Sequence, residues 1–145
     1  MTQGNAHRWP VRVYFEDTDA GGIVYHARFL AFAERARTEA LRALGAPHQE
    51  LVDQHDLLFI VRRVEVDYLS PARLDQALCV VTRVAALGGA SVTLAQGVEA
   101  EDGAVHATLR VVLVCVRLAD NRPARIPRRW RTALMGLLTA AERGS

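Results

Sequence analysis

Residues Tyr14–His26 have the sequence YFEDTDAGGIVYH, in which a cluster of acids is followed by a pair of glycines. Residues 9–16, which overlap the start of this motif, alternate apolar and polar side chains, and this pattern is typical of a half-buried strand. Residues 17–25 are expected to form a loop, because Gly21 and Gly22 can adopt backbone angles that other residues avoid. An amphipathic segment follows, so the acids are expected to lie near the start of a helix.

That helix is predicted over Phe29–Leu44, and Gly45 followed by Pro47 is typical of a helix end. Helical spacing puts most of its apolar residues on one face, namely Phe29, Leu30, Ala33, Ala36, Ala40, Leu41 and Leu44. Arg37 is an exception on this face. It is expected either to extend its charged end toward water or to pair with Glu34 one turn earlier.

The rest of the chain is dominated by apolar runs separated by turn residues, which favour an antiparallel sheet. The predicted strands are Leu57–Tyr68, Gln76–Ala85, Ser91–Ala100 and Ala104–Arg117, with a short helical turn at His48–His55. A further short helix is expected in the tail, where Trp130, Leu134, Leu137 and Leu138 have helical spacing. The order of one strand, one long helix and four strands indicates an α+β fold in which the helix covers one face of the sheet.

Composition limits the possible classes of protein. The 145 residues suit one domain, residues 1–145, and 50% hydrophobic with 23% charged residues is ordinary for a globular chain. All 18 basic residues are arginine, but the net charge of +2 is too small to predict nucleic-acid binding. Cys79 and Cys115 lie in apolar runs, which favours reduced core cysteines. With no predicted signal peptide or membrane span, a cytoplasmic location without membrane insertion is expected.

Several common catalytic patterns are missing from the sequence. It contains no phosphate-binding glycine loop, no serine elbow and no pair of residues with zinc-ligand spacing. What remains is the acidic cluster at residues 16–19, His26 and the start of the helix. The first turn of a helix carries free N–H groups and partial positive charge, which would stabilise the oxyanion formed when a thioester carbonyl is attacked. A nearby carboxylate would attack that carbonyl or activate a water molecule.

The same residues also allow an ordinary structural interpretation. Aspartates before a helix often cap it or form a turn, and a glycine pair often marks only a turn. His26 alone is equally compatible with helix capping or packing. The residues by themselves therefore leave catalysis and local structure open as alternatives.

Four stretches together resemble the hotdog-fold acyl-CoA thioesterases of the 4-hydroxybenzoyl-CoA thioesterase and YbgC type. These are residues 12–29, 34–39, 61–63 and 68–75, and the similarity extends from about Trp9 to Pro127, leaving a short helical tail. The resemblance implies a hotdog fold, in which a five-stranded antiparallel sheet wraps one long helix. It also implies that two subunits join their sheets, with active sites at the interface, and that such dimers often form a homotetramer.

The resemblance further implies roles for particular residues. Asp19 would be the catalytic carboxylate, His26 would orient water or assist it, and the backbone N–H near His26 would bind the thioester oxygen. The residues expected to contact substrate are Tyr14, Gly21, Gly22, Tyr25, Val61 and Arg62. The YbgC type often has two adjacent tyrosines where this chain has Tyr14 and Phe15. Any role for a hydroxyl at the second position is therefore absent or moved. Strand alternation predicts that Phe15 faces the core and Tyr14 does not, so Tyr14 is not expected to take over that role.

The implied reaction is hydrolysis of an acyl-CoA to a free acid and CoA, with no metal and no cofactor beyond the CoA of the substrate. Phosphates of CoA suit arginine. Arg62 and Arg63 are expected to point to opposite faces of their strand, so only one would reach a given ligand. The five arginines of residues 122–131 either grip phosphates or form a solvated basic tail.

Two other functions have to be weighed against thioester hydrolysis. A hotdog dehydratase acting on acyl carrier protein is disfavoured, because the chain lacks the His-Phe-Pro motif of those enzymes. The alternative from another class is a non-catalytic module that binds an acyl chain or acyl carrier protein in envelope lipid metabolism. Acyl length stays open, although Ile23, Leu58 and Phe59 are candidates to line the acyl site.

Overall fold

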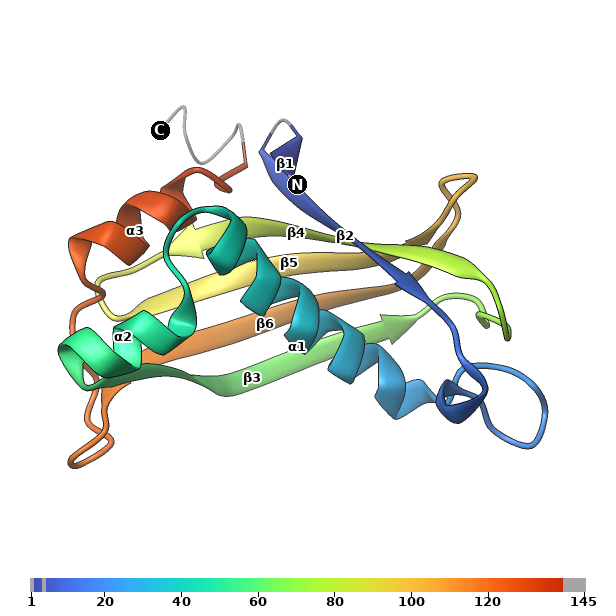
Figure 1. The fold of residues 1–145 in the computed structure, drawn as a ribbon, viewed down its shortest axis with the longest axis horizontal. Helices are drawn as coiled ribbons and strands as arrows, with labels where there is room; N and C mark the ends of the chain where they lie inside the picture. The colour runs from blue at the N-terminus through green and yellow to red at the C-terminus, as the bar shows by residue number, and fades with distance from the viewer. Residues whose placement is uncertain (1, 4, 140–145) are drawn as a thin grey trace.

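The computed structural model describes residues 2–3 and 5–139, which form an antiparallel sheet with helices on one face (Figure 1). The strands are β1 (Thr2–Gln3), β2 (Ala6–Arg12), β3 (Leu57–Tyr68), β4 (Ala77–Leu87), β5 (Ser91–Ala100) and β6 (Val105–Arg117). The helices are α1 (His26–Ala43), α2 (His48–His55) and α3 (Arg128–Met135). Among these described residues the strand order is β1-β2-β4-β5-β6-β3, so β3 lies at one edge.

The predicted architecture is confirmed, with small changes at the ends of elements. The five predicted strands are present, and the two-residue β1 pairs with β2 as an addition. Helix α1 lies across the sheet as expected, but it begins at His26 rather than Phe29. Tyr25 is extended and precedes the first turn, whose residues His26, Ala27 and Arg28 are not fully buried. Because that turn makes no apolar stripe, hydrophobic spacing could not reveal it.

The first strand ends earlier than predicted, and the placement of Phe15 is wrong. Strand β2 stops at Arg12, and residues 15–17 form a single 3₁₀ turn. The carboxylate of Asp17 accepts a hydrogen bond from the Tyr14 N–H at 2.9 Å, which turns the chain out of the strand direction. Alternation therefore holds only as far as the buried Val13, and Phe15 is 81% exposed.

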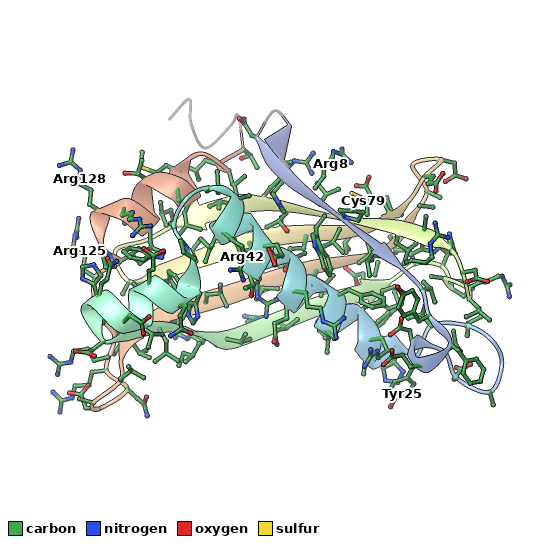
Figure 2. All side chains as sticks on the ribbon, in the orientation of Figure 1. Arg8, Tyr25, Arg42, Cys79, Arg125 and Arg128 are labelled. Carbon is green, nitrogen blue, oxygen red and sulfur yellow. The ribbon has the colours of Figure 1, made fainter. Side chains whose placement is uncertain are left out.

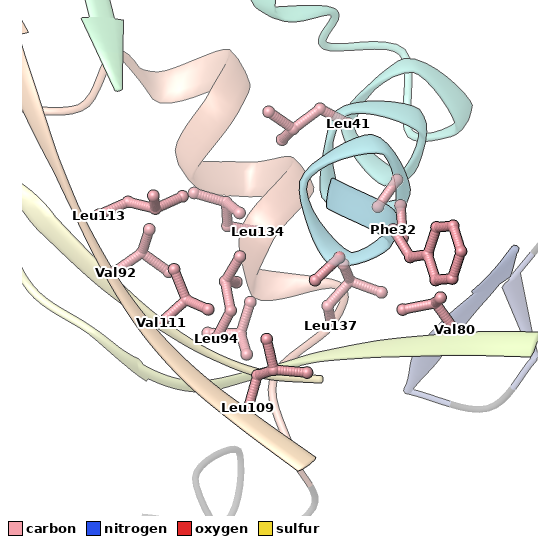
Figure 3. Packing of buried hydrophobic residues seen from close by; sticks show 14 of the residues in the cluster. Phe32, Leu41, Val80, Val92, Leu94, Leu109, Val111, Leu113, Leu134 and Leu137 are labelled. Atoms are coloured by element: carbon pink, nitrogen blue, oxygen red, sulfur yellow. The ribbon is translucent and has the colours of Figure 1, made fainter. Parts of the chain in front are cut away.

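The core lies between α1 and the sheet, and α3 closes one end of it (Figure 3). The buried residues of α1 are Phe29, Phe32, Ala33, Ala36, Ala40 and Leu41. Small alanines let the helix approach the strands closely, and α3 contributes Trp130 and Leu134, which are also buried. Two details of the predicted helix face differ: Phe32 is buried, whereas Leu30 is 39% exposed.

Strand β3 has a free edge and an irregularity in its middle. It pairs with β6 on one side only, and Ile60, Val61 and Val64 are exposed along it. The register changes between Val61, which lies opposite Leu113, and Arg63, so that Arg62 is an inserted residue. The simple alternation behind the prediction for Arg62 and Arg63 is therefore interrupted at that point.

No helix within residues 2–3 and 5–139 is long and apolar enough to cross a membrane. Cys79 and Cys115 are both free thiols, Cys115 being buried and Cys79 partly exposed, in agreement with the prediction of reduced cysteines.

Candidate active site at the start of helix α1

The loop that carries Asp19 is held in place by backbone hydrogen bonds. The Asp19 N–H donates to the Ile23 carbonyl oxygen at 2.9 Å, which closes the loop on itself. The Val24 N–H donates to the Ala72 carbonyl oxygen at 2.7 Å, and Ile23 forms an antiparallel bridge with Arg73. The loop is thus attached to the turn between β3 and β4, and it leads directly into α1 (Figure 1).

The Asp19 side chain is exposed and forms one local hydrogen bond. Its Oδ1 accepts the Gly21 N–H at 2.8 Å, and Oδ2 has no hydrogen-bond partner within the described residues. A Cβ atom at Gly21 would lie 3.3 Å from the same Oδ1, and Gly22 has a φ of +78°, which favours glycine. The glycine pair therefore gives the loop its tight shape and leaves one face of the carboxylate open.

Asp17 differs sharply from Asp19, although the two are separated by a single residue. Asp17 is buried, and its Oδ1 accepts hydrogen bonds from Arg28 Nε at 3.0 Å and Nη2 at 2.6 Å. Its Oδ2 accepts the Tyr14 N–H. Asp17 is therefore a structural residue that joins the 3₁₀ turn to the first turn of α1.

The first turn of α1 offers hydrogen-bond donors. The N–H groups of His26 and Ala27 have no acceptor among the described residues, as expected where no preceding turn exists. The helix dipole adds partial positive charge at the same place. These donors suit a carbonyl oxygen that becomes negative during reaction.

Aromatic rings surround this helix start. The centroid of the His26 ring lies 4.5 Å from the ring centroid of Tyr25 and 5.9 Å from that of Tyr68. The Tyr68 ring also packs against Phe29. Tyr25, marked in Figure 2, and His26 are exposed. Sequence reasoning did not single out Tyr68 for the site, because it lies at the far end of β3 and only the fold brings it to His26.

The predicted site residues fall into two groups in space. Asp19, Gly21, Gly22, Tyr25 and His26 all lie in the loop or at the start of α1. No hydrogen bond joins the Asp19 and His26 side chains among the described contacts. The structure therefore brings these five residues to one end of the molecule without a direct polar contact between the two predicted catalytic groups.

Tyr14 adjoins this end group, because its N–H donates to Asp17, which also binds Arg28 in the first turn of α1, whereas Val61 and Arg62 lie apart from it. Tyr14 is 60% exposed and lines a shallow hollow beside Arg28. Val61 and Arg62 are in the middle of β3, and Val61 is seven residues, or about 23 Å of strand, from Tyr68. Within one chain, therefore, Val61 and Arg62 are not brought to Asp19.

The arginine-rich tail is partly structural. Arg129 donates hydrogen bonds to the Gly45 carbonyl oxygen and to Glu50, and Arg131 donates to the Gly88 carbonyl oxygen at 2.8 Å. The side chains of Arg122, Arg125 and Arg128 are exposed, and no hydrogen bond or ion pair is found for them in the described part of the chain. Arg125 and Arg128 are labelled in Figure 2. Of the five arginines in residues 122–131, these three therefore have side chains available for phosphate contacts.

Comparison with known proteins identifies the family and the fold of the chain. The family model of the thioesterase-like superfamily matches residues 13–134. The acyl-CoA thioester hydrolase YbgC of Escherichia coli O6:H1 is 42% identical over 121 residues, covering 83% of this chain and 90% of that protein. The acyl-CoA thioesterase YbgC of Haemophilus influenzae is 41% identical over 129 residues, covering 89% of this chain and 94% of that protein.

Solved structures agree with this assignment. A probable thioesterase from Bartonella henselae has a TM-score of 0.79 at 34% identity, covering 84% of this chain and 99% of that one. A 1,4-dihydroxy-2-naphthoyl-CoA thioesterase from Synechocystis has a TM-score of 0.84 at 22% identity, covering 90% and 96%, and supports the fold alone. The predicted hotdog fold is confirmed. Because the family model spans most of the chain and two YbgC proteins are similar over most of its length, the chain belongs to the thioesterase-like superfamily, as a hotdog-fold protein of the YbgC type.

Proposed function

We propose that this protein hydrolyses an acyl-CoA thioester, with Asp19 as the reacting carboxylate and the first turn of α1 as the oxyanion site. Membership of the YbgC type makes the chain a thioester hydrolase. The observation that carries the assignment to Asp19 is its exposure: Asp17 is committed to Arg28, whereas Asp19 Oδ2 is open to solvent beside the helix start.

The chemistry follows from these positions. The thioester oxygen would accept hydrogen bonds from the N–H groups of His26 and Ala27, which stabilise the negative charge that develops there. Asp19 would act as nucleophile or take a proton from water as the water oxygen adds to the carbonyl carbon. In both routes the carbon–sulfur bond breaks, and the CoA thiolate leaves and takes up a proton. The water route then leaves the free acid directly. The nucleophile route leaves an anhydride of the acyl group with Asp19, which a water molecule hydrolyses to the free acid and the Asp19 carboxylate. His26 would orient the water or assist Asp19.

The substrate site would be completed by a second copy of the chain. Val61 and Arg62 lie far from Asp19 in one chain, yet β3 has a free, partly apolar edge on which a second sheet can continue. Three aromatic side chains around the loop, Tyr14, Phe15 and Tyr25, are also exposed. A homodimer, or a homotetramer of two dimers, would place these surfaces against one another. Contacts of substrate with Tyr14, Gly21, Gly22 and Tyr25 would then come from one subunit and those with Val61 and Arg62 from the other.

The test is thiol release from a panel of acyl-CoAs, from acetyl to palmitoyl with benzoyl and hydroxybenzoyl. Asp19→Asn should lower kcat about 10²–10⁴-fold, the usual contribution of a positioned base. Asp102→Asn is a matched control, because Asp102 accepts the N–H two residues later at 2.9 Å in an exposed turn, as Asp19 does. Full activity of Asp19→Asn would reject the mechanism, and loss of its oligomer would make Asp19 structural.

The second candidate function is binding without turnover, with an acyl chain or acyl carrier protein as the ligand. The exposed tail arginines Arg122, Arg125 and Arg128 favour an acidic partner of this kind. The same panel, extended to acyl carrier protein thioesters, separates the two functions. A folded oligomer that binds these thioesters and releases no thiol would support the binding module.

A further inference from the structure

His106 is a buried polar residue near the start of β6, outside the candidate active site. It lies where the register between β5 and β6 shifts. Val98 lies opposite Ala107, whereas its neighbour Glu99 lies opposite Val105. His106 is therefore an inserted residue, and insertions of this kind often redirect a side chain beside an active site.

The two ring nitrogens of His106 contact the two ends of the turn that joins β3 to β4, residues 69–76. Its Nε2 lies 2.9 Å from Gln76 Nε2. Its Nδ1 lies 3.0 Å from Ser70 Oγ and 3.2 Å from the Ser70 carbonyl oxygen. The His106 carbonyl oxygen also accepts the N–H groups of Leu69 and Ser70, at 2.9 and 3.2 Å. One residue of β6 thus holds both ends of the 69–76 turn.

The direction of these hydrogen bonds follows from the amide of Gln76. Its Oε1 accepts the Arg73 N–H at 3.0 Å, so its Nε2 is the group that donates to His106. His106 Nε2 is then an acceptor, and in a neutral imidazole the hydrogen is on the other nitrogen, Nδ1. That N–H is directed at Ser70, whose carbonyl and hydroxyl oxygens are both acceptors. Position 106 therefore needs an acceptor toward one end of the turn and a donor toward the other.

The 69–76 turn is also the segment to which the Asp19 loop is attached (Figure 1). The Ala72 carbonyl oxygen accepts the Val24 N–H at 2.7 Å. The Leu74 N–H donates to the Gly22 carbonyl oxygen at 3.4 Å. Both contacts lie between the two ends that the imidazole holds. The position of the Asp19 carboxylate relative to the start of α1 therefore depends on where this turn lies.

We infer that His106 is a positioning residue, which holds the Asp19 loop in place through the 69–76 turn. Both of its ring nitrogens are occupied by the turn, so it acts on the site without contacting substrate. Its effect on turnover rests on the proposed function, since it requires Asp19 to be the reacting carboxylate. Its effect on the position of the loop does not.

The kinetic test uses His106→Leu, which removes both ring contacts and leaves an apolar side chain at the buried position. In thiol release from the best acyl-CoA of the panel, kcat per folded subunit should fall about 10-fold or more, because a displacement of about 1 Å is enough for such a loss. KM should change by less than about 3-fold, since the loss is in the reacting geometry. His106→Gln keeps an acceptor toward Gln76 and should restore part of kcat.

Arg129→Leu is the matched control for loss of stability. Arg129 also ties a distant turn by side-chain hydrogen bonds, from its Nε and Nη2 to the Gly45 carbonyl oxygen at 2.9 and 2.7 Å. Gly45 follows the far end of α1, away from the Asp19 loop. This variant should lower stability and leave kcat unchanged.

Hydrogen–deuterium exchange tests the position of the loop without any measurement of activity. In His106→Leu, residues 18–25 and 69–76 should exchange at least about 10-fold faster than in the wild type, because the hydrogen bonds between the loop and the turn open more often. Strands β4 and β5 should exchange at the wild-type rate. In Arg129→Leu, residues 18–25 should be unaffected.

Three results would overturn the inference: unchanged exchange at residues 18–25 in His106→Leu, an unchanged kcat in that variant although Asp19→Asn is inactive, or an equal loss of kcat in Arg129→Leu. Should His106→Leu fail to fold, Gln76→Leu breaks the contact from the turn and should give the same faster exchange and the same loss of kcat. If Asp19→Asn is fully active, the proposed function fails, and faster exchange at residues 18–25 still supports the role of His106 in holding the loop.

Discussion

Arg28 and Asp17 are joined side by side across the start of α1, with Arg28 Nε and Nη2 at 3.0 and 2.6 Å from Asp17 Oδ1. The carboxylate is buried and the guanidinium is partly buried, so the pair is shielded from water more than a surface ion pair. It fixes the polypeptide on both sides of the Asp19 loop. The two acids of one short motif thus differ in their surroundings, since Asp17 is bound within the fold and Asp19 is exposed to solvent.

Removal of the buried acid should cost stability, and removal of the exposed acid should not. Asp17→Ala is expected to lower the free energy of unfolding by about 2 kcal/mol, because it leaves Arg28 and the Tyr14 N–H without their acceptor. Asp19→Ala should change it by less than about 0.5 kcal/mol, as for an ordinary surface site. Urea unfolding of the two variants measures both values. Equal losses of unfolding free energy in the two variants would contradict the assignment of a structural role to Asp17 and not to Asp19.

His48 should make the protein less stable in mild acid. Its Nε2 accepts the Phe59 N–H at 3.0 Å, and burial lowers its pKa below the ordinary 6.5. The folded imidazole therefore resists a proton that the unfolded chain accepts. The stabilisation is complete above pH 6.5 and is lost as pH falls below that value toward the folded pKa.

His48→Gln provides the comparison for this pH dependence, since glutamine keeps an acceptor but does not titrate. The variant should lose less stability than the wild type between about pH 7.5 and about pH 5, as measured by urea unfolding at each pH. Burial also lowers the pKa of His7, but His7 is present in both proteins and cancels in the difference. Identical pH profiles would show that the His48 contact contributes nothing.

The two thiols should differ in reactivity. Burial raises the pKa of Cys115 to about 11, whereas Cys79 is only partly buried. A chromogenic disulfide reagent should modify Cys79 alone in the native protein at about pH 8, and both thiols after unfolding. Cys79→Ser should then give no signal before unfolding. This variant also removes the protein's own background from the thiol-release assay.

The free edge of β3 should mediate self-association. Ile60→Lys places a charge on an exposed position of that edge and should shift the sedimentation coefficient at micromolar concentration toward the monomer. Leu118→Lys is the control, because Leu118 is also exposed but lies outside the sheet. A wild-type monomer, or an unaffected Ile60→Lys oligomer, would exclude this edge as the interface.

Hydrophobic periodicity was sufficient to predict the strands and the main helix, because burial of one face repeats along each of them. It failed for Phe15, where one hydrogen bond from the Tyr14 backbone to the Asp17 side chain ends the strand. Such a local polar contact does not repeat along the sequence, so hydrophobic periodicity cannot reveal it. The Tyr68–His26 contact was missed for another reason: the residues are far apart in the sequence and meet only after β3 has paired with β6.

The inserted residue Arg62 changes which residues of β3 face α1. Before it, Phe59 and Val61 lie opposite Cys115 and Leu113, which belong to the core beneath α1. After it, even-numbered residues take such positions, with Val66 opposite Leu109 and Tyr68 opposite Ala107. Uninterrupted alternation from Leu57 would have turned Arg63, Glu65 and Asp67 toward α1. One inserted residue thus keeps three charges out of the interior and brings the aromatic ring of Tyr68 to His26 at the start of α1.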